Sequence, residues 1–116
     1  MSITSRRILV VDDEPSMCDF LQVFLVKEGH SVMTVLTARE ALTTLESGHF
    51  DLVLTDLYMP EMRGDELAQA IKGAHAAVYI ILFSGLPPKL RPEPIDLMVR
   101  KPASVQELRD AIAACP

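Results

Sequence analysis

Residues 51–60, DLVLTDLYMP, form an apolar run that ends on the carboxylate of Asp56 and passes at once into a loop closed by Pro60. The run lacks the alternation of polar and apolar residues that is typical of a strand with one solvated face. It therefore predicts a short strand, covered on both faces, that carries an acidic side chain at its carboxyl end.

Four other runs rich in valine, isoleucine and leucine have a similar length and character. The five predicted strands are RILVVD at 7–12, SVMTVL at 31–36, DLVLTD at 51–56, VYIILFS at 78–84 and IDLMVR at 95–100. Three of them are apolar almost throughout, which is typical of a parallel sheet with helices on both faces.

The segments between the strands show helical spacing of apolar residues. Four helices are predicted, with apolar faces at 17–25, 38–45, 67–74 and 105–112. Pro15 suits a first helical turn, Ser104 suits an N-cap, and Gly29 and Gly48 suit helix ends. Because strand and helix alternate, we expect an α/β fold with right-handed crossovers between parallel strands.

The alternation fails once, between the fourth and fifth strands. Residues 85–94, GLPPKLRPEP, contain four prolines, and each proline inside a helix costs about 3 kcal/mol. We expect a loop there, with at most one turn of 3₁₀ helix. The predicted architecture is a doubly wound five-stranded sheet with four helices.

Length and composition predict a single domain over residues 1–116, which could belong to a longer protein. The chain is 49% apolar with a net charge of −5 and scattered basic residues, so direct nucleic-acid binding is not expected. The apolar run near the N-terminus is too short for a signal peptide or a membrane span. Two distant cysteines, Cys18 and Cys115, are expected to be reduced, as in a cytoplasmic protein.

Polar residues stand at the carboxyl ends of four predicted strands. Asp12 and Asp13 close the first, Asp56 the third and Ser84 the fourth, and Lys101 follows the fifth. Each alone has an ordinary explanation, such as a helix cap or a solvated lysine. Together they predict a site, because ligands of doubly wound sheets bind beyond the carboxyl ends of the strands.

The chemistry of these five residues is coherent. Three carboxylates repel one another, and a hard divalent cation such as Mg²⁺ relieves that repulsion. A carboxylate can also be a nucleophile that forms an aspartyl-phosphate. A lysine and a hydroxyl would then bind phosphoryl oxygens.

The motifs ILVVDDE, DLVLTDLYMPEMRGDEL, ILFSG and VRKP resemble the receiver domain of bacterial two-component response regulators, over nearly the whole chain. The resemblance implies a flavodoxin-like sheet of strand order 2-1-3-4-5. It also implies that Asp56 is the phosphoacceptor. Asp12, Asp13, Asp56 and the backbone carbonyl of Tyr58 are then expected to bind Mg²⁺.

The same resemblance gives Ser84 the role of the switch hydroxyl and Lys101 that of the phosphate-contacting lysine, with a cis peptide bond before Pro102. Met98 departs from the family's pattern, because an aromatic switch residue usually stands three places before the lysine. The helix that normally follows the fourth strand is also replaced by the proline-rich loop. We therefore expect a signal to pass through residues 85–94, or through the first or last helix.

The function that these residues favour is a phosphorylatable receiver, without conventional substrate turnover. Its expected partners are a sensor histidine kinase or phosphotransfer protein, and a downstream protein or fused output domain. In the family that the chain resembles, the residues two places after the phosphoacceptor and after the switch residue control the access of water; here they are Tyr58 and Leu86, whose bulky, non-basic side chains predict slow self-dephosphorylation. An alternative is a pseudo-receiver that acts by protein contact without phosphorylation. An aspartate-nucleophile phosphatase is disfavoured, because Tyr58 occupies the second acidic place of a D-x-D motif.

Overall fold

The computed structural model describes residues 5–116, so the first four residues of the predicted domain lie outside the described residues. Five strands and four helices follow one another along these described residues. They are β1 (Arg7–Val11), α1 (Pro15–Lys27), β2 (Ser31–Val35), α2 (Ala38–Ser47), β3 (Leu52–Thr55), α3 (Gly64–Ala74), β4 (Tyr79–Ser84), β5 (Leu97–Arg100) and α4 (Val105–Ala113). Every predicted element is present, with its ends shifted by a few residues at most.

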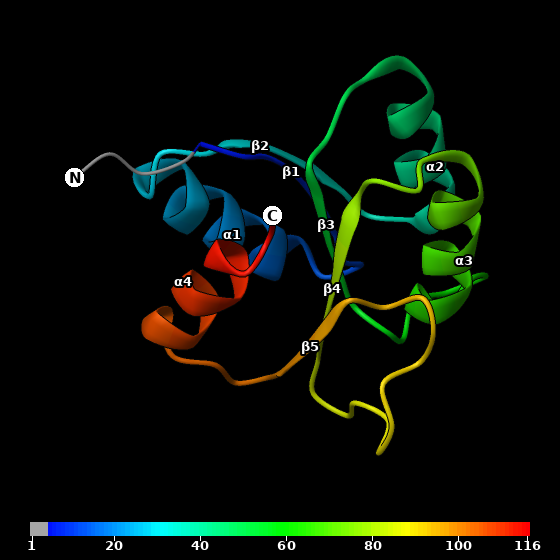
Figure 1. Cartoon of the computed structure of the whole chain (residues 1–116). Helices are drawn as coiled ribbons and strands as arrows, with labels where there is room; N and C mark the ends of the chain where they lie inside the picture. The colour runs from blue at the N-terminus through cyan, green and yellow to red at the C-terminus, as the bar shows by residue number, and fades with distance from the viewer. Residues whose placement is uncertain (1–4) are drawn as a thin grey trace.

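The five strands form one parallel sheet in the order β2-β1-β3-β4-β5, which confirms the predicted doubly wound, flavodoxin-like fold. Helices α1 and α4 cover one face and α2 and α3 cover the other (Figure 1). The three central strands are buried along nearly their whole length. This burial is why their sequences are continuously apolar instead of alternating.

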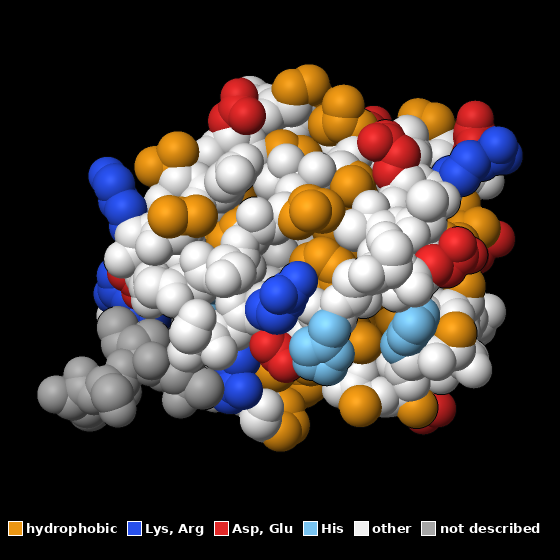
Figure 2. Space-filling view, turned by 90° about the horizontal axis from the view of Figure 1, so that it is seen from above, with side chains coloured by type: hydrophobic (Ala, Val, Ile, Leu, Met, Phe, Trp, Pro, Cys, Tyr) orange, Lys and Arg blue, Asp and Glu red, His pale blue; other side chains and the backbone are white. Residues whose placement is uncertain are grey.

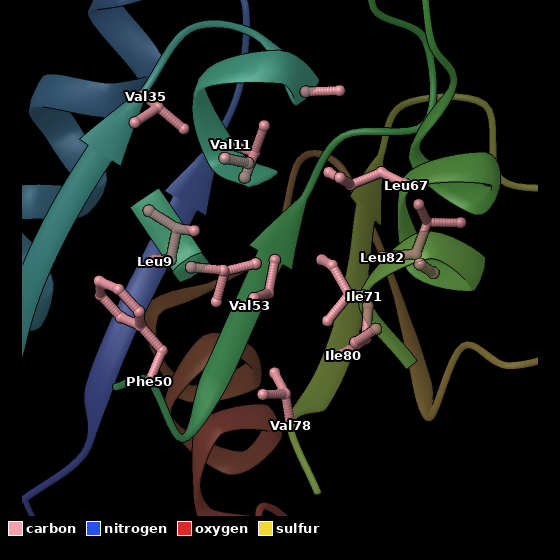
Figure 3. Close-up of a cluster of buried hydrophobic side chains, with 14 of the residues drawn as sticks. Leu9, Val11, Val35, Phe50, Val53, Leu67, Ile71, Val78, Ile80 and Leu82 are labelled. Carbon is pink, nitrogen blue, oxygen red and sulfur yellow. The ribbon is translucent and has the colours of Figure 1, made fainter. Parts of the chain in front are cut away.

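Two apolar clusters hold the helices against the sheet. The first includes Leu9, Val53 and Leu82 of the strands, Leu67 and Ile71 of α3 and buried residues of α2, and in it Leu82 lies beside the two α3 residues (Figure 3). The second lies under α1 and α4 and includes buried residues of β1, β3, β4 and both helices. Each central strand contributes to both clusters, because successive side chains point to opposite faces.

The ends of the helices follow the expected local chemistry. Ser104 caps α4: its hydroxyl accepts a hydrogen bond from the backbone N–H of Glu107, whose carboxylate accepts one from the N–H of Ser104. Gly29 ends α1 with a φ of 96°, a conformation that favours glycine. Thr37, which the sequence analysis did not single out, caps α2: its hydroxyl accepts a hydrogen bond from the N–H of Glu40 and donates one to the carboxylate of Glu40.

The proline-rich segment 85–94 contains no helix, as predicted, and forms a projecting loop between β4 and β5 (Figure 1). Its C-terminal end is fixed: a guanidinium nitrogen of Arg91 donates to the carbonyl of Asp96 at 2.8 Å, and the N–H of buried Ile95 donates to the carbonyl of Pro92. Asp96 in turn accepts a hydrogen bond from the N–H of Ile80 and pairs with Lys72 of α3 at 3.0 Å. Leu86 and Leu90, nearer its start, are exposed.

Figure 2 looks from above Figure 1 onto the end of the molecule where the chain enters β3 and β4. Acidic, basic and histidine side chains are interspersed there with hydrophobic ones, and no single charge covers this face. Within residues 5–116, no helix combines the length and apolar character needed to cross a membrane.

Candidate functional site

Three carboxylates meet at the carboxyl end of the sheet. Asp12 and Asp13 follow β1 and Asp56 follows β3, and these strands are neighbours, so that the N–H of Asp56 donates to the carbonyl of Val11 at 3.0 Å. One oxygen from each carboxylate lies within 4.8 Å of the others. Asp12 is buried, Asp56 is partly buried and Asp13 is exposed. The group therefore opens to solvent on the side of Asp13.

Lys101 brings an ammonium into the same group. Its Nζ lies 2.9 Å from Oδ2 of Asp12 and 3.6 Å from Oδ2 of Asp56, with only 14% of the side chain exposed. The backbone N–H of Lys101 donates to the carbonyl of Ser84 at 2.9 Å. The Lys101–Pro102 peptide bond is cis, as the resemblance implied. The structure thus joins the acids after β1 and β3 to the lysine after β5.

Phe83 is a contact of Lys101 that the sequence analysis missed. The Lys101 ammonium lies 5.2 Å from the centre of the Phe83 ring, a cation–π arrangement. Phe83 is buried in β4 and reads in the sequence as one more apolar strand residue. Nothing in its local pattern distinguishes it from a core residue, so only the register between β4 and β5 could have revealed it.

The backbone and side chain of Asp12 are held from several directions. Its Oδ1 accepts a hydrogen bond from the N–H of Glu14 at 3.0 Å, and its own N–H donates to the carbonyl of Val35 at 3.2 Å. The thiol of Cys18 donates to its carbonyl at 3.3 Å. Burial, assisted by the negative charge of Asp12, raises the pKa of the Cys18 thiol, which keeps the donor protonated. Both cysteines are free and buried, as expected, and Cys18 also supports the site.

The orientation of Asp56 depends on Gly64, a second residue that the sequence analysis missed. Oδ1 of Asp56 accepts a hydrogen bond from the N–H of Leu57 at 2.8 Å, and the carbonyl of Leu57 accepts one from the N–H of Gly64 at 2.8 Å. A Cβ atom at Gly64 would stand 2.1 Å from the backbone oxygen of Asp56. Only glycine allows α3 to start this close to the end of β3. The interval of eight residues between Asp56 and Gly64 carries no general sequence signal for this contact.

Ser84 and Tyr58 lie beside the group but differ in exposure. Ser84 is 1% exposed, and its hydroxyl oxygen accepts a hydrogen bond from the N–H of Leu86 at 3.3 Å. The side chain of Tyr58 is 50% exposed, and the guanidinium of Arg63 lies 5.5 Å from the centre of its ring. Arg63 is itself oriented by Asp65 through two hydrogen bonds. The ring of Tyr58 and the guanidinium of Arg63 therefore lie together within the segment between Asp56 and α3.

The donor set suits a hard divalent cation. Three carboxylates and one ammonium leave a formal charge of −2, and every side-chain ligand atom offered is an oxygen, the type that Mg²⁺ prefers. The same group holds a carboxylate, Asp56, close to a cation that could neutralise a transferred phosphoryl group. The site is therefore fitted for a phosphoryl or another small oxyanion bound together with a metal ion.

Comparison with known proteins defines the class to which this fold and site belong. The family model of the response regulator receiver domain matches residues 8–113. The chain belongs to this family, and it is a receiver domain of two-component response regulators, a signalling domain and not a conventional enzyme.

Individual relatives agree with this assignment. The chain is 33% identical over 78 residues to the regulatory protein VanR of Enterococcus faecium, and this match covers 67% of the chain and 34% of the relative. It is 34% identical over 84 residues to the DNA-binding response regulator MtrA of Mycolicibacterium smegmatis, covering 72% of this chain and 36% of the relative. The chain thus spans about a third of the length of these curated relatives.

Solved structures match over nearly the whole chain. The response regulator TrrA of Thermotoga maritima, solved in complex with Mg²⁺ and BeF, shares 33% identity with a TM-score of 0.87, covering 96% of this chain and 99% of that one. The receiver domain of an HD-domain protein of Pseudomonas fluorescens shares 26% identity with a TM-score of 0.90, and the match covers 97% of this chain and 94% of that one.

Proposed function

We propose that this receiver domain accepts a phosphoryl group on Asp56, from a sensor histidine kinase or a phosphotransfer protein, in a Mg²⁺-dependent reaction. The observation that carries the proposal is the convergence of Asp12, Asp13 and Asp56 within 4.8 Å, with Lys101 bridging two of them. A fold alone would not support this function, because one fold hosts many activities.

The residues that would hold Mg²⁺ are Asp12, Asp13 and Asp56 together with the backbone carbonyl of Tyr58. Their oxygens fit the ion's preference, and the related TrrA structure contains Mg²⁺ with BeF. When bound, Mg²⁺ would neutralise charge on the phosphoryl oxygens during transfer.

The two oxygens of Asp56 have different surroundings, which suggests which one reacts. Oδ1 accepts the hydrogen bond from Leu57, whereas Oδ2 faces the ammonium of Lys101. We assign Oδ2 as the nucleophile. It forms a bond to phosphorus while the phosphorus–nitrogen bond of the donor's phosphohistidine breaks, and the electron pair stays on the imidazole nitrogen.

Lys101 and Ser84 would respond to the new charge. Lys101 contacts carboxylates before transfer, and its flexible stem lets the ammonium turn to a phosphoryl oxygen after it. The hydroxyl of Ser84 can donate a hydrogen bond to another oxygen of the phosphoryl group. The Ser84 hydroxyl also accepts a hydrogen bond from the N–H of Leu86. Rotation of this hydroxyl would therefore change a hydrogen bond at the start of the loop 85–94.

The output is proposed to leave through this loop or through the surface of α1 or α4. Met98, which stands where an aromatic switch is usual, packs partly buried against the first core cluster, and a flexible methionine offers no ring that could swing out. Since the chain spans about a third of its curated relatives, we propose a fused output domain or a separate downstream protein as its partner, in the cytoplasm.

The test is exposure of the purified chain to acetyl phosphate or beryllofluoride with and without Mg²⁺. We expect a phosphoprotein by mass spectrometry only when Mg²⁺ is present, and a raised melting temperature with beryllofluoride. Asp56→Asn should abolish both effects, whereas Asp19→Asn, on the exposed surface of α1, should retain them. Mg²⁺-independent labelling, or labelling that survives Asp56→Asn, would contradict the proposal.

A second candidate function is a pseudo-receiver that acts by protein contact alone. Two departures from the family's pattern favour this function. Within the described residues, Met98 stands in place of the aromatic switch, and no helix follows β4 before β5. The same experiment separates the two. A folded protein that gains neither phosphoryl group nor thermal shift at millimolar Mg²⁺ would support the pseudo-receiver.

A further inference from the structure

A cavity of about 310 Å³ lies between α1 and α4, away from the acidic site. Two of its lining residues, Arg6 and His30, directly precede β1 and β2. In a parallel sheet this places the cavity near the amino ends of the strands, whereas Asp12, Asp13 and Asp56 follow the carboxyl ends. The cavity is therefore separate from the proposed phosphorylation site.

The inner wall of the cavity is apolar. Phe24 and Leu25 line it from α1, and Ile112 and Ala113 line it from α4. Leu25 and Ile112 are almost fully buried, and they also belong to the second core cluster. The Phe24 ring is stacked against that of Phe20, with 6.2 Å between the ring centres. This apolar wall with its aromatic ring suits a compact apolar group.

The charged residues at the cavity do not all have partners. Arg109 pairs with Glu28 through two hydrogen bonds that join α4 to α1, and its third nitrogen donates to Gln106. Arg6 donates through one nitrogen to the carbonyl of Cys115. Within residues 5–116, no carboxylate forms an ion pair with Arg6. The cavity consequently carries one positive charge that no protein carboxylate neutralises.

His30 adds a hydrogen-bond donor of defined type. Its Nδ1 accepts a hydrogen bond from the backbone N–H of Arg6 at 3.0 Å. A nitrogen that accepts carries no proton in the neutral ring, so the proton resides on Nε2. Burial lowers the pKa of His30, which favours this neutral form. The cavity is thus lined by a guanidinium that forms no ion pair with a carboxylate and by an imidazole whose Nε2 carries a proton, and both groups can donate hydrogen bonds to a carboxylate.

We propose that this cavity binds a small monocarboxylate with an aromatic tail. The carboxylate is bound by Arg6 and the Nε2–H of His30, and the tail packs among Phe24, Leu25 and Ile112. The volume is at the lower end of the range for ligand sites, which excludes large cofactors. A ligand in this position contacts both α1 and α4 and stabilises their packing, and its binding does not depend on Asp56.

The experiment is a titration of the full chain with 3-phenylpropionate, followed by isothermal calorimetry and by amide chemical shifts. The neutral analogue 3-phenylpropanol serves as the ligand control. Ala113→Phe fills the cavity from an exposed position, and Ala114→Phe is its matched control, because Ala114 is also exposed but does not line the cavity. Arg6→Gln removes the unpaired charge.

We expect saturable binding with shifts confined to α1, α4 and the residues before β1 and β2. Ala113→Phe should abolish it and Ala114→Phe should not. Loss of the charge, either by Arg6→Gln or by use of the alcohol, should weaken binding by about tenfold, the equivalent of one charge-assisted hydrogen bond. Equal affinity for acid and alcohol, binding that survives Ala113→Phe, or an absence of saturation would overturn the proposal. Asp56→Asn should bind normally, so failure of the phosphorylation proposal would leave this result unaffected.

Discussion

The ammonium of Lys101 lies 2.9 Å from the carboxylate of Asp12, although 89 positions separate the two residues in the chain. The pair is largely shielded from water, since the exposed fractions of the two side chains are 14% and 3%. Removing one partner of such a pair leaves an uncompensated buried charge, which is costly. Lys101 therefore acts as an internal counterion for a site that still has an excess of negative charge.

Divalent cations should stabilise the fold through this excess charge. We expect Mg²⁺ to raise the free energy of unfolding by about 1.4 kcal/mol at tenfold above its dissociation constant. Asp13→Asn should reduce the effect strongly, whereas Asp19→Asn should leave it intact. Thermal melting in Mg²⁺ or in EDTA measures the difference. Equal Mg²⁺ responses of the two variants would contradict this prediction.

Two glycines of α3 should respond to alanine with opposite signs. Gly64→Ala places a Cβ 2.1 Å from the carbonyl oxygen of Asp56, so we expect a loss of about 1–3 kcal/mol of stability. Gly73→Ala meets no atom within 4 Å and should add about 0.5–1 kcal/mol, because alanine favours a helix. Urea unfolding of both variants gives the two values. A neutral Gly64→Ala would show that the start of α3 can move away from Asp56.

The partly buried imidazole of His30 should make stability depend on pH in the weakly acidic range. Burial lowers its pKa below the ordinary value of 6.5, so the unfolded chain takes up the proton at higher pH than the folded chain. The contribution of His30 is therefore fully present above pH 6.5 and decreases as pH falls toward the folded pKa. The stability difference between wild type and His30→Gln should shrink over this interval. A difference that stays constant would place His30 in a water-like environment.

The ring of Tyr58 should slow the loss of a phosphoryl group from Asp56. Tyr58 offers bulk and no basic group, and Arg63 lies against the ring. If Asp56 is phosphorylated as proposed, Tyr58→Gly should lose phosphate several-fold faster than wild type, because water gains access. Tyr58→Phe keeps the ring and should behave as wild type. Release of inorganic phosphate after removal of the donor is the measurement, and an unchanged rate in the glycine variant contradicts the prediction.

Amide exchange should reveal the route of the output. We expect beryllofluoride with Mg²⁺ to change exchange near Leu86, whose N–H is bound to the Ser84 hydroxyl, more than near Ile95, whose N–H is bound within the fixed end of the loop. Changes in α1 or α4 would indicate the alternative surfaces. Changes confined to the loops that carry Asp12, Asp13 and Asp56 would argue against transmission through any of the three.

Much of this structure could be predicted from sequence because its signals are local. A run such as 52–55 reads as a doubly covered strand from its own composition, and the prolines of 85–94 exclude a helix without reference to other residues. The convergence of Asp12, Asp56 and Lys101 followed from a rule of parallel sheets and not from any pattern in the chain. The described structure confirms both the order of the strands and this convergence.

The features that were missed depend on spatial neighbours. Phe83 contacts Lys101 because of the register between β4 and β5, and Gly64 approaches the backbone of Asp56 because α3 begins close to the end of β3. The cavity at Arg6 and Arg109 also depends on spatial neighbours, since two helices far apart in sequence form its walls. The residue type at one position of an apolar or polar run does not predict contacts of this kind.

The way in which the acidic site is distributed over the chain has a practical consequence. Asp12 follows β1, Asp56 follows β3 and Lys101 follows β5, and the loop segment 85–94 lies between Asp56 and Lys101 in the chain. A protein divided within that segment would leave both acids on one fragment and the lysine on the other. Restoration of the ion pair would then require the two fragments to reassociate in the native arrangement. The properties of this site could therefore be used to measure whether a divided protein has reassembled.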